Sequence, residues 1–312
     1  MAVAQQAAKV VRIGILVDGA PAETVHARLA FIREEFAKLG YVEGRTIAFE
    51  ERGSQGAPDI LANQATELVA LRCDVIIAIA TGAARAAQRA TTTIPIVVGS
   101  VGDPIGDGLA ASLSHPGGNI TGTTFLGPEL VSKRFDMLKQ LLPAASRIGV
   151  LWNPKAFSDQ TTAAMVDQAT KAARALNLRL HYIDVPSLEA FESAFAEAAK
   201  EHSDAVFQFP NTTFFVNRKH LVDVAAQFQL PVMYNAKEFV EVGGLIGYGS
   251  SPLALNRKTV IFVDRILKGA KPADLPIEQP TSFDLAINLK TAAALGLTVP
   301  QLLLAQADEV LE

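Results

Sequence analysis

The sequence has few of the residues that metal, redox and membrane chemistry require. Among its 312 residues the only cysteine is Cys73, so the chain can form neither an intrachain disulfide nor a thiolate metal cluster. Its five histidines are scattered, without the short regular separations of a metal site. No apolar run reaches the length of about 18 residues that a transmembrane helix needs. We therefore expect no metal and no cofactor, and we expect Cys73 to be a small buried hydrophobe.

Signatures of enzymes and of DNA-binding proteins are absent too. The chain has no Walker A segment and no nucleophile elbow, and the glycines of residues 102–108 are in the wrong order for a dinucleotide-binding loop. The net charge of −4 shows no excess of positive charge, which would favour binding to nucleic acid or anionic lipid. No helix-turn-helix is recognisable at the N-terminus. These absences argue against an enzyme and against a nucleic-acid partner.

What the sequence does contain is a regular alternation of strand-like and helix-like segments. Residues 74–84 show it best, because a β-branched apolar run breaks at Thr81-Gly82 and continues as an alanine-rich segment with high helix propensity. Such alternation predicts an α/β fold of doubly wound parallel sheets with right-handed crossovers. The pattern restarts near residue 130, which predicts two lobes. Residues 25–39 and 300–311 are expected to be helices, and 243–249 a strand or hinge.

Ligands of open parallel sheets bind beyond the carboxyl ends of the strands, so the residues at those predicted ends are candidate ligand contacts. They are small, hydroxyl, amide or carboxylate residues: Asp18, Gly19, Ala20, Thr81, Gly82, Ala83, Gly102, Asp103, Asn153, Asn211 and Thr212. Aromatic residues near the same ends complete the candidate set: Phe209, Tyr234 and Tyr248. Free backbone N–H groups where a strand feeds a helix favour an anion at residues 81–83.

Most of these candidates have a purely structural explanation as well. Thr81 is a good helix N-cap, and Asp103 precedes a proline, as residues that start turns often do. Asn153 and Asn211 are turn formers, and the aromatic residues are typical of a core. At the N-terminus, Ala2-Val3-Ala4 followed by two glutamines is typical of the end of a signal peptide, although a disordered tail explains it equally well.

Several motifs are spread over nearly the whole chain: residues 12–16, 39–45, 94–97, 101–106, 116–122, 153–154, 239–244, 248–249, 264–276 and 287–292. Together they resemble those of ABC importer substrate-binding proteins, in the tryptophan/tyrosine-type group. One departure is the loop after the first strand, where residues 19–22 are small and apolar and the family usually has a longer polar stretch.

The resemblance implies a type I periplasmic binding fold, with two lobes joined by hinge strands at 122–125, 245–249 and 277–283. Lobe 1 would comprise residues 10–122 and 247–280, and lobe 2 residues 123–246 and 281–312. Export to the periplasm is implied as well. Residues 1–9 would then be a disordered tail left after removal of a signal peptide that this sequence does not contain. The expected partners of this monomer are a small solute and a membrane permease.

For an amino-acid ligand captured by hinge closure, aromatic ones being favoured, we expect the carboxylate to lie at Thr81, Gly82 and Ala83. The ammonium group would face Asp103, helped by Asn153 or Asn211, and the ligand side chain would meet Phe209, Tyr234 or Tyr248. Three alternatives stay open: an aromatic or aliphatic carboxylic acid without an amine, an enzyme on a doubly wound fold, and a cytoplasmic effector sensor.

Overall fold

The computed structural model describes residues 10–19, 26, 29–54 and 58–312, and it divides into two compact units. The first unit comprises the described residues up to Gly99 together with Leu109–Thr123 and Asn256–Ile277. The second comprises Ser100–Gly108, Thr124–Leu255 and Glu278–Glu312. Six segments thus alternate between the units, so the chain passes from one to the other five times.

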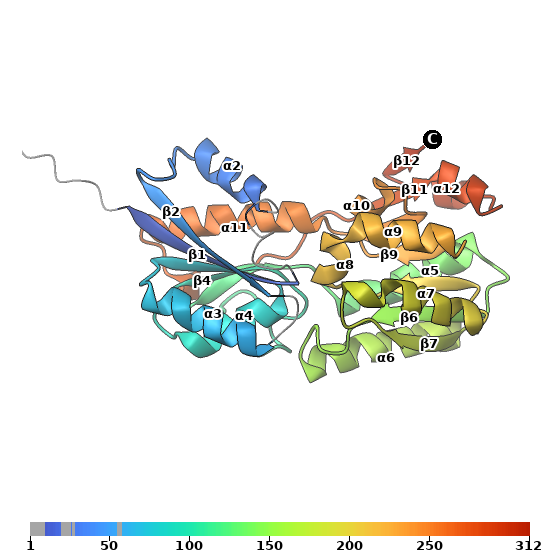
Figure 1. Cartoon of the computed structure of the whole chain (residues 1–312), viewed down its shortest axis with the longest axis horizontal. Coiled ribbons are helices and arrows are strands. Elements are labelled where there is room, and N and C mark those ends of the chain that lie inside the picture. The colour runs from blue at the N-terminus through green and yellow to red at the C-terminus, as the bar shows by residue number, and fades with distance from the viewer. Residues whose placement is uncertain (1–9, 20–25, 27–28, 55–57) are drawn as a thin grey trace, which may run out of the picture. The chain divides into compact units, whose positions relative to one another are not determined.

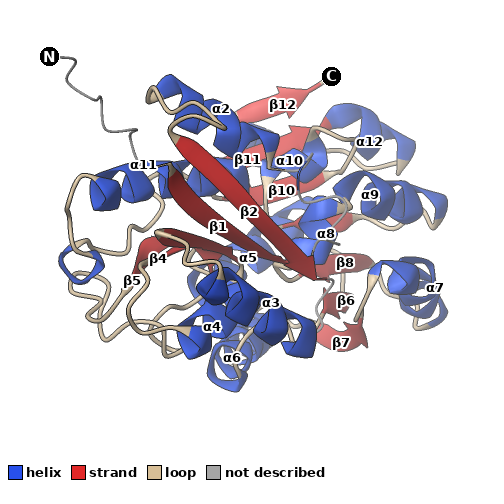
Figure 2. Cartoon of the chain, turned by 60° about the vertical axis from the view of Figure 1, so that its left-hand side comes forward, coloured by secondary structure: helices blue, strands red, loops and turns tan. Residues whose placement is uncertain are grey.

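The first unit is built on a five-stranded sheet in the order β2-β1-β3-β4-β5. β1 pairs in parallel with β2 and β3, and β3 with β4. Helices α3 and α4 cover one face of this sheet, and α2 and α11 cover the other (Figure 1, Figure 2). The elements are β1 (Val11–Asp18), α2 (Ala30–Lys38), β2 (Ile47–Ser54), α3 (Pro58–Ala70), β3 (Val75–Ile79), α4 (Thr81–Ala90), β4 (Ile96–Val101), β5 (Ile120–Thr124), α11 (Pro252–Leu267) and η3 (Pro272–Asp274).

Strands β1, β3, β4 and β5 are buried along most of their length, as continuous apolar runs predict, whereas β2 at the edge of the sheet is mostly only partly buried. On β1, Ile13 and Ile15 pack in one cluster with residues of α2 and α11. The opposite face carries Gly14, where a methyl group would lie 3.2 Å from Cys73 Sγ. Cys73 is 4% exposed, which confirms the expectation of a small buried residue, and burial raises the pKa of its thiol to about 11.

The second unit is built on a seven-stranded sheet in the order β12-β11-β10-β9-β8-β6-β7. Its pairs are parallel except β10 with β11, which are antiparallel. One apolar cluster includes residues of α5 and α6, and another includes residues of α7 and α9. The elements are η1 (Pro128–Leu130), α5 (Val131–Leu141), β6 (Arg147–Trp152), α6 (Asp159–Ala175), β7 (Arg179–Asp184), η2 (Leu188–Ala190), α7 (Phe191–Lys200), β8 (Ala205–Gln208), α8 (Thr212–Val216), α9 (Arg218–Gln227), β9 (Val232–Tyr234), α10 (Lys237–Val240), β10 (Ile246–Gly249), β11 (Asp284–Asn288), α12 (Leu289–Ala294), α13 (Gln301–Leu304) and β12 (Glu309–Leu311).

The boundaries between the units differ from the predicted lobes by a few residues at 123 and at 278–280, and by longer segments at two other places. The prediction placed a hinge strand at 245–249 and assigned residues 247–255 to lobe 1. In the structure, β10 is paired with β9 and β11 inside the second sheet. The passage to the first unit lies instead at 255/256, within α11. Residues 100–108 also belong to the second unit. The other two predicted hinges do contain passages, at 123/124 and 277/278.

The predicted helix over residues 300–311 is wrong. Only α13 is helical there, and the chain then forms β12, which pairs in parallel with β11. Asp308 explains the change, because its N–H donates to Leu285 O and its Oδ2 accepts from the Leu285 N–H, both at 2.8 Å. The predicted helix over 25–39 is seen as α2, and part of its expected beginning lies outside the described residues, as does the predicted tail 1–9.

A buried carboxyl group, Glu238 of α10, joins that helix to the segment after β10. It is 3% exposed, its Oε1 accepts a hydrogen bond from the Ser251 hydroxyl, and its Oε2 has no partner among the described residues. Burial raises the pKa of Glu238. The unfolded chain therefore releases this proton at a lower pH than the folded chain. The stability that protonated Glu238 contributes is fully present below the pKa of the unfolded chain. It is lost as the pH rises through the pKa of the folded chain.

We expect Glu238→Gln, which is neutral at every pH, to raise the free energy of unfolding near neutral pH by about 1 kcal/mol. Urea denaturation followed by circular dichroism at several pH values measures this. Glu201→Gln, at an exposed position just after α7, is the matched control. A stability difference from the parent protein that is the same at acidic and at neutral pH would show that Glu238 does not titrate as argued.

Candidate functional site

Three neighbouring strands of the first sheet end in a backbone conformation that L-residues rarely adopt. Ala80 follows β3 with φ 74°, Ser100 lies near the end of β4 with φ 54°, and Leu126 lies just after β5 with φ 57°. The Ala80 N–H donates to Gly99 O at 3.0 Å, so the neighbouring strand helps to hold this conformation. Such residues cost about 1–3 kcal/mol each and cluster at functional sites. They mark the carboxyl edge as the candidate ligand-binding edge.

Asp18, the last residue of β1, lies against the first turn of α4. A methyl group at Gly82 would overlap Asp18 Oδ2, so the carboxylate and the Gly82 backbone are in direct contact. A carboxylate is favourable at a helix N-terminus because the helix dipole is positive there. This edge of the first unit therefore already places a carboxyl group where the sequence predicts the carboxylate of a ligand.

The other predicted contacts on the first unit are mostly enclosed. Thr81 and Ala83 are 2% and 0% exposed within α4, and the N-cap residue is Ala80 rather than Thr81. Gly19 extends the pairing of β1 by donating its N–H to Ser54 O at 2.7 Å. Ala20 lies outside the described residues.

On the second unit, the loop 100–108 is held by two aspartates. Asp103 Oδ1 accepts from the N–H groups of Ile105 at 3.2 Å and Gly106 at 2.9 Å, so this carboxylate starts a turn. Asp107, 7% exposed, accepts from the Thr161 hydroxyl at 2.8 Å and the Ser158 N–H at 3.2 Å, which fixes the loop to the beginning of α6. Sequence reasoning missed Asp107, because nothing in its spacing distinguishes it from a solvated loop residue.

A pair of partly exposed aromatic rings adjoins this loop. The ring centroids of Phe125 and Phe157 lie 6.1 Å apart. Both rings pack on Gly102, where a methyl group would lie 3.1 Å from Phe157 Cε1 and 3.4 Å from Phe125 Cζ. The structure thus brings the predicted contacts Gly102 and Asp103 together with two aromatic rings that the candidate set does not contain.

The predicted aromatic contacts lie elsewhere. Phe209, 3% exposed, packs with its ring centroid 5.9 Å from that of Phe207. Tyr234, 1% exposed, stacks on Phe239 with centroids 4.9 Å apart, and burial raises its pKa. Both are core residues, which was the alternative explanation of their positions. Tyr248 is partly exposed and packs near Phe283.

The predicted polar contacts on the second unit serve the backbone around them. Asn153 Oδ1 accepts from the Lys155 N–H at 2.9 Å, and Asn211 Oδ1 accepts from the Thr213 N–H at 2.7 Å as the N-cap of α8. Thr212 is partly exposed on the first turn of α8. These hydrogen bonds agree with the turn-forming explanation of both asparagines, and ligand contact by them stays a prediction.

Polar groups that the sequence did not single out meet at the carboxyl edge of the second sheet. Arg134, on the first turn of α5, is 1% exposed and donates from Nε to Tyr248 O at 2.7 Å and from Nη2 to Asn235 O at 3.4 Å. Gln208 ends β8, and its Oε1 accepts from the Asn235 N–H at 3.2 Å. Burial lowers the pKa of Arg134 to about 9.

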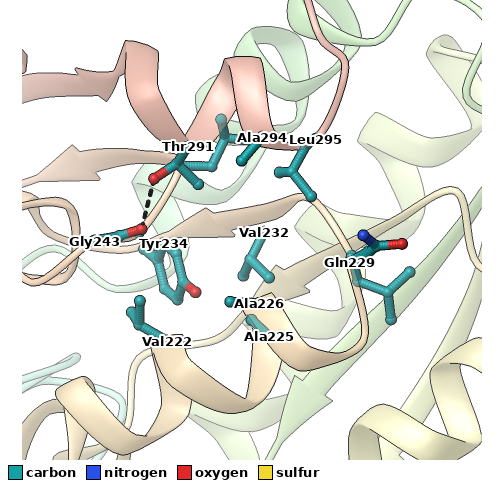
Figure 3. A pocket seen from close by; sticks show the side chains of 13 residues that line it. Val222, Ala225, Ala226, Gln229, Val232, Tyr234, Gly243, Thr291, Ala294 and Leu295 are labelled. Atoms are coloured by element: carbon teal, nitrogen blue, oxygen red, sulfur yellow. Dashed lines mark hydrogen bonds between the residues drawn. The ribbon is translucent and has the colours of Figure 1, made fainter. Parts of the chain in front are cut away.

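A separate pocket of about 130 Å³ lies at the opposite end of these strands. Val232, the first residue of β9, lines it together with aliphatic residues of α9 and α12 (Figure 3). The Thr291 hydroxyl donates to Gly243 O at 2.8 Å. Gln229 and the predicted contact Tyr234 also line the pocket, so it is apolar with a few polar groups at its wall.

In the part of the chain that the structure describes, no three histidine, cysteine or acidic residues are grouped to hold a metal ion. Within the same residues no helix has both the length and the apolar character to cross a membrane.

Two α/β units linked by several passages of the chain, with polar loops at the carboxyl edges of their sheets, define a binding protein of the type I periplasmic fold. The chain belongs to the family of ABC transporter substrate-binding proteins, whose family model matches residues 22–311. Proteins of this family bind small solutes and deliver them to ABC permeases, and they act outside the cytoplasm.

Individual relatives agree with this assignment. A tyrosine-binding protein of Clostridioides difficile (strain R20291) is 27% identical over 260 residues, which cover 83% of this chain and 73% of that protein. A crystal structure of a conserved domain protein from Vibrio cholerae matches with a TM-score of 0.84 and 29% identity, over 97% of this chain and 100% of that one. An ABC domain in complex with L-Trp from Streptococcus pneumonia matches with a TM-score of 0.82 and 27% identity, over the same shares.

Proposed function

We propose that this protein captures an aromatic L-amino acid for an ABC importer and has no catalytic activity of its own. The observation that carries the proposal is the partly exposed pair Phe125 and Phe157, which adjoins Gly102 and Asp103 on the second unit. Aromatic rings present apolar faces to an aromatic ligand, and a neighbouring carboxylate attracts its ammonium group. Relatives named for tyrosine and solved with L-Trp support the same ligand class.

The wider assignment follows from the family. We propose that the protein is exported, works as a monomer and delivers its solute to a membrane permease. Capture between two lobes by hinge closure stays a prediction, as do the contacts proposed at Thr81, Gly82 and Ala83.

Titration calorimetry with L-tryptophan, L-tyrosine, L-phenylalanine, L-leucine and L-lysine tests the proposal. We expect the aromatic amino acids to bind about 2- to 12-fold more tightly than L-leucine, because an aromatic pair contributes about 0.5–1.5 kcal/mol beyond burial. Phe157→Ala is expected to weaken L-tryptophan by about tenfold. The matched control is Phe228→Ala, which removes a partly exposed ring that stacks on Phe195. Equal binding of all five amino acids, or of none, would contradict the proposal.

A carboxylic acid without an amine is the second candidate ligand. It is favoured by Asp103, whose Oδ1 already accepts two backbone hydrogen bonds and so has less capacity left for an ammonium group. Indole-3-propionate, which lacks the amine of tryptophan, separates the two candidates. Tighter binding of this acid than of L-tryptophan would establish the second candidate, a carboxylic acid without an amine, as the ligand class.

A further inference from the structure

The polar groups of Arg134, Gln208 and Asn235 are buried, yet each has an atom with no hydrogen-bond partner. The side chains are 1%, 0% and 9% exposed. Among the residues that the structure describes, no group bonds to Arg134 Nη1, Gln208 Nε2 or Asn235 Oδ1. Buried polar atoms are almost always paired, because each unpaired one costs about 1–3 kcal/mol. Three such unpaired atoms, in residues that contact one another, therefore require an explanation.

The charge of Arg134 makes the requirement stronger. The guanidinium forms no ion pair with a described carboxylate, and the oxygens that it does contact are the backbone carbonyls of Tyr248 and Asn235. A buried charge is normally paired with an opposite charge, since desolvation is otherwise uncompensated. An anion bound at this place would supply that partner.

The position of these residues is that of a ligand site. Gln208 ends β8, Asn235 directly follows β9, and Tyr248 lies on β10, so the group sits at the carboxyl edge of three adjacent strands of one sheet. Arg134 reaches the same edge from the first turn of α5. Ligands of such sheets bind at that edge. Asn235 is the most exposed of the three and is the outermost member of the group.

The unpaired atoms also have a specific chemical pattern. Arg134 Nη1 and Gln208 Nε2 are donors, and Asn235 Oδ1 is an acceptor. The head group of a zwitterionic amino acid offers the complement, with a carboxylate that accepts and an ammonium that donates. We infer that Arg134, Gln208 and Asn235 form the head-group subsite of the second unit: the first two bind the ligand carboxylate, and Asn235 accepts from the ammonium. This inference rests on the proposed function. It assigns the ligand carboxylate to Arg134 rather than to the N-terminus of α4, and the ammonium group to Asn235 rather than to Asp103.

Calorimetry with L-tryptophan and with tryptamine, which lacks the carboxylate, tests the subsite. Arg134→Met is expected to weaken the binding of L-tryptophan by about 100-fold and the binding of tryptamine by less than about threefold. The reason is that only L-tryptophan has the carboxylate whose charge-assisted hydrogen bond is lost. Arg147→Met, an exposed arginine at the amino end of β6, is the matched control and should change neither value.

Since Arg134→Met could impair folding, Gln208→Glu gives an independent test. This substitution keeps the acceptor for the Asn235 N–H and supplies an internal carboxylate beside the subsite. It is expected to raise the melting temperature and to weaken L-tryptophan by at least about 30-fold. If the parent protein binds L-tryptophan and Gln208→Glu binds it equally well, the subsite is refuted while the proposed function stands. If the parent protein binds no aromatic amino acid, the proposed function fails and the subsite with it.

Discussion

Gly122→Ala is expected to abolish the native fold or to lower the free energy of unfolding by about 4 kcal/mol or more, an exceptional loss for one methyl group. Gly122 lies on β5 with φ 141°, and an added methyl group would overlap the backbone oxygen of Val98 on β4. Backbone atoms cannot rotate away as a flexible side chain can, so the two strands would have to separate. The passage from the first unit to the second follows at 123/124, so the strain would fall on that connection.

Gly118→Ala is the matched control for this prediction. Gly118 also has a positive φ, 65°, but a methyl group there would meet no atom within 4 Å. It should therefore cost only the conformational strain of an alanine in this region, about 1–2 kcal/mol. Urea denaturation of the two variants separates strain from overlap. Equal losses for both would show that the close approach of β5 to β4 is unimportant.

Much of the fold could be predicted from the sequence, because long apolar runs and the helical spacing of apolar residues indicate directly which residues are buried. β3 is the clearest case, since all five of its residues are buried as the run over 75–79 requires. The errors fall where tertiary pairing decides. Residues 309–311 form a strand only because β11 lies beside them, and nothing in their own sequence opposes a helix.

The candidate site was harder to predict, because the sequence gives strand ends but not the atoms that surround them. The strand-end rule selected the loops around Asp18, Gly82 and Asp103, and ligand contact there stays a prediction. It could not show that Asp18 faces Gly82, or that Phe209 points into the core, since both depend on distant parts of the chain. Arg134 was missed because it lies on an ordinary amphipathic helix, where a charged residue is usually solvated.

Asp107→Leu is expected to cost about 3 kcal/mol of stability and to weaken L-tryptophan by more than about tenfold, because it removes two charge-assisted hydrogen bonds from a buried group. The Thr161 hydroxyl and the Ser158 N–H would lose this acceptor at the beginning of α6. The loop 100–108 would no longer be fixed, and with it the backbone of Gly102 on which Phe125 and Phe157 pack. Stability and affinity should therefore fall together.

Two further variants distinguish loss of the loop anchor from loss of charge alone. Asp107→Asn keeps an oxygen that accepts from Thr161 and should retain most of the affinity, since neutral hydrogen bonds have about half the strength of charged ones. Asp159→Ala removes an exposed acid from the first turn of the same helix and should leave affinity unchanged. If Asp107→Leu destabilised the protein but bound L-tryptophan as the parent does, the loop and the aromatic pair beside it would be structural, and the ligand would have to be bound by other residues of the carboxyl edge.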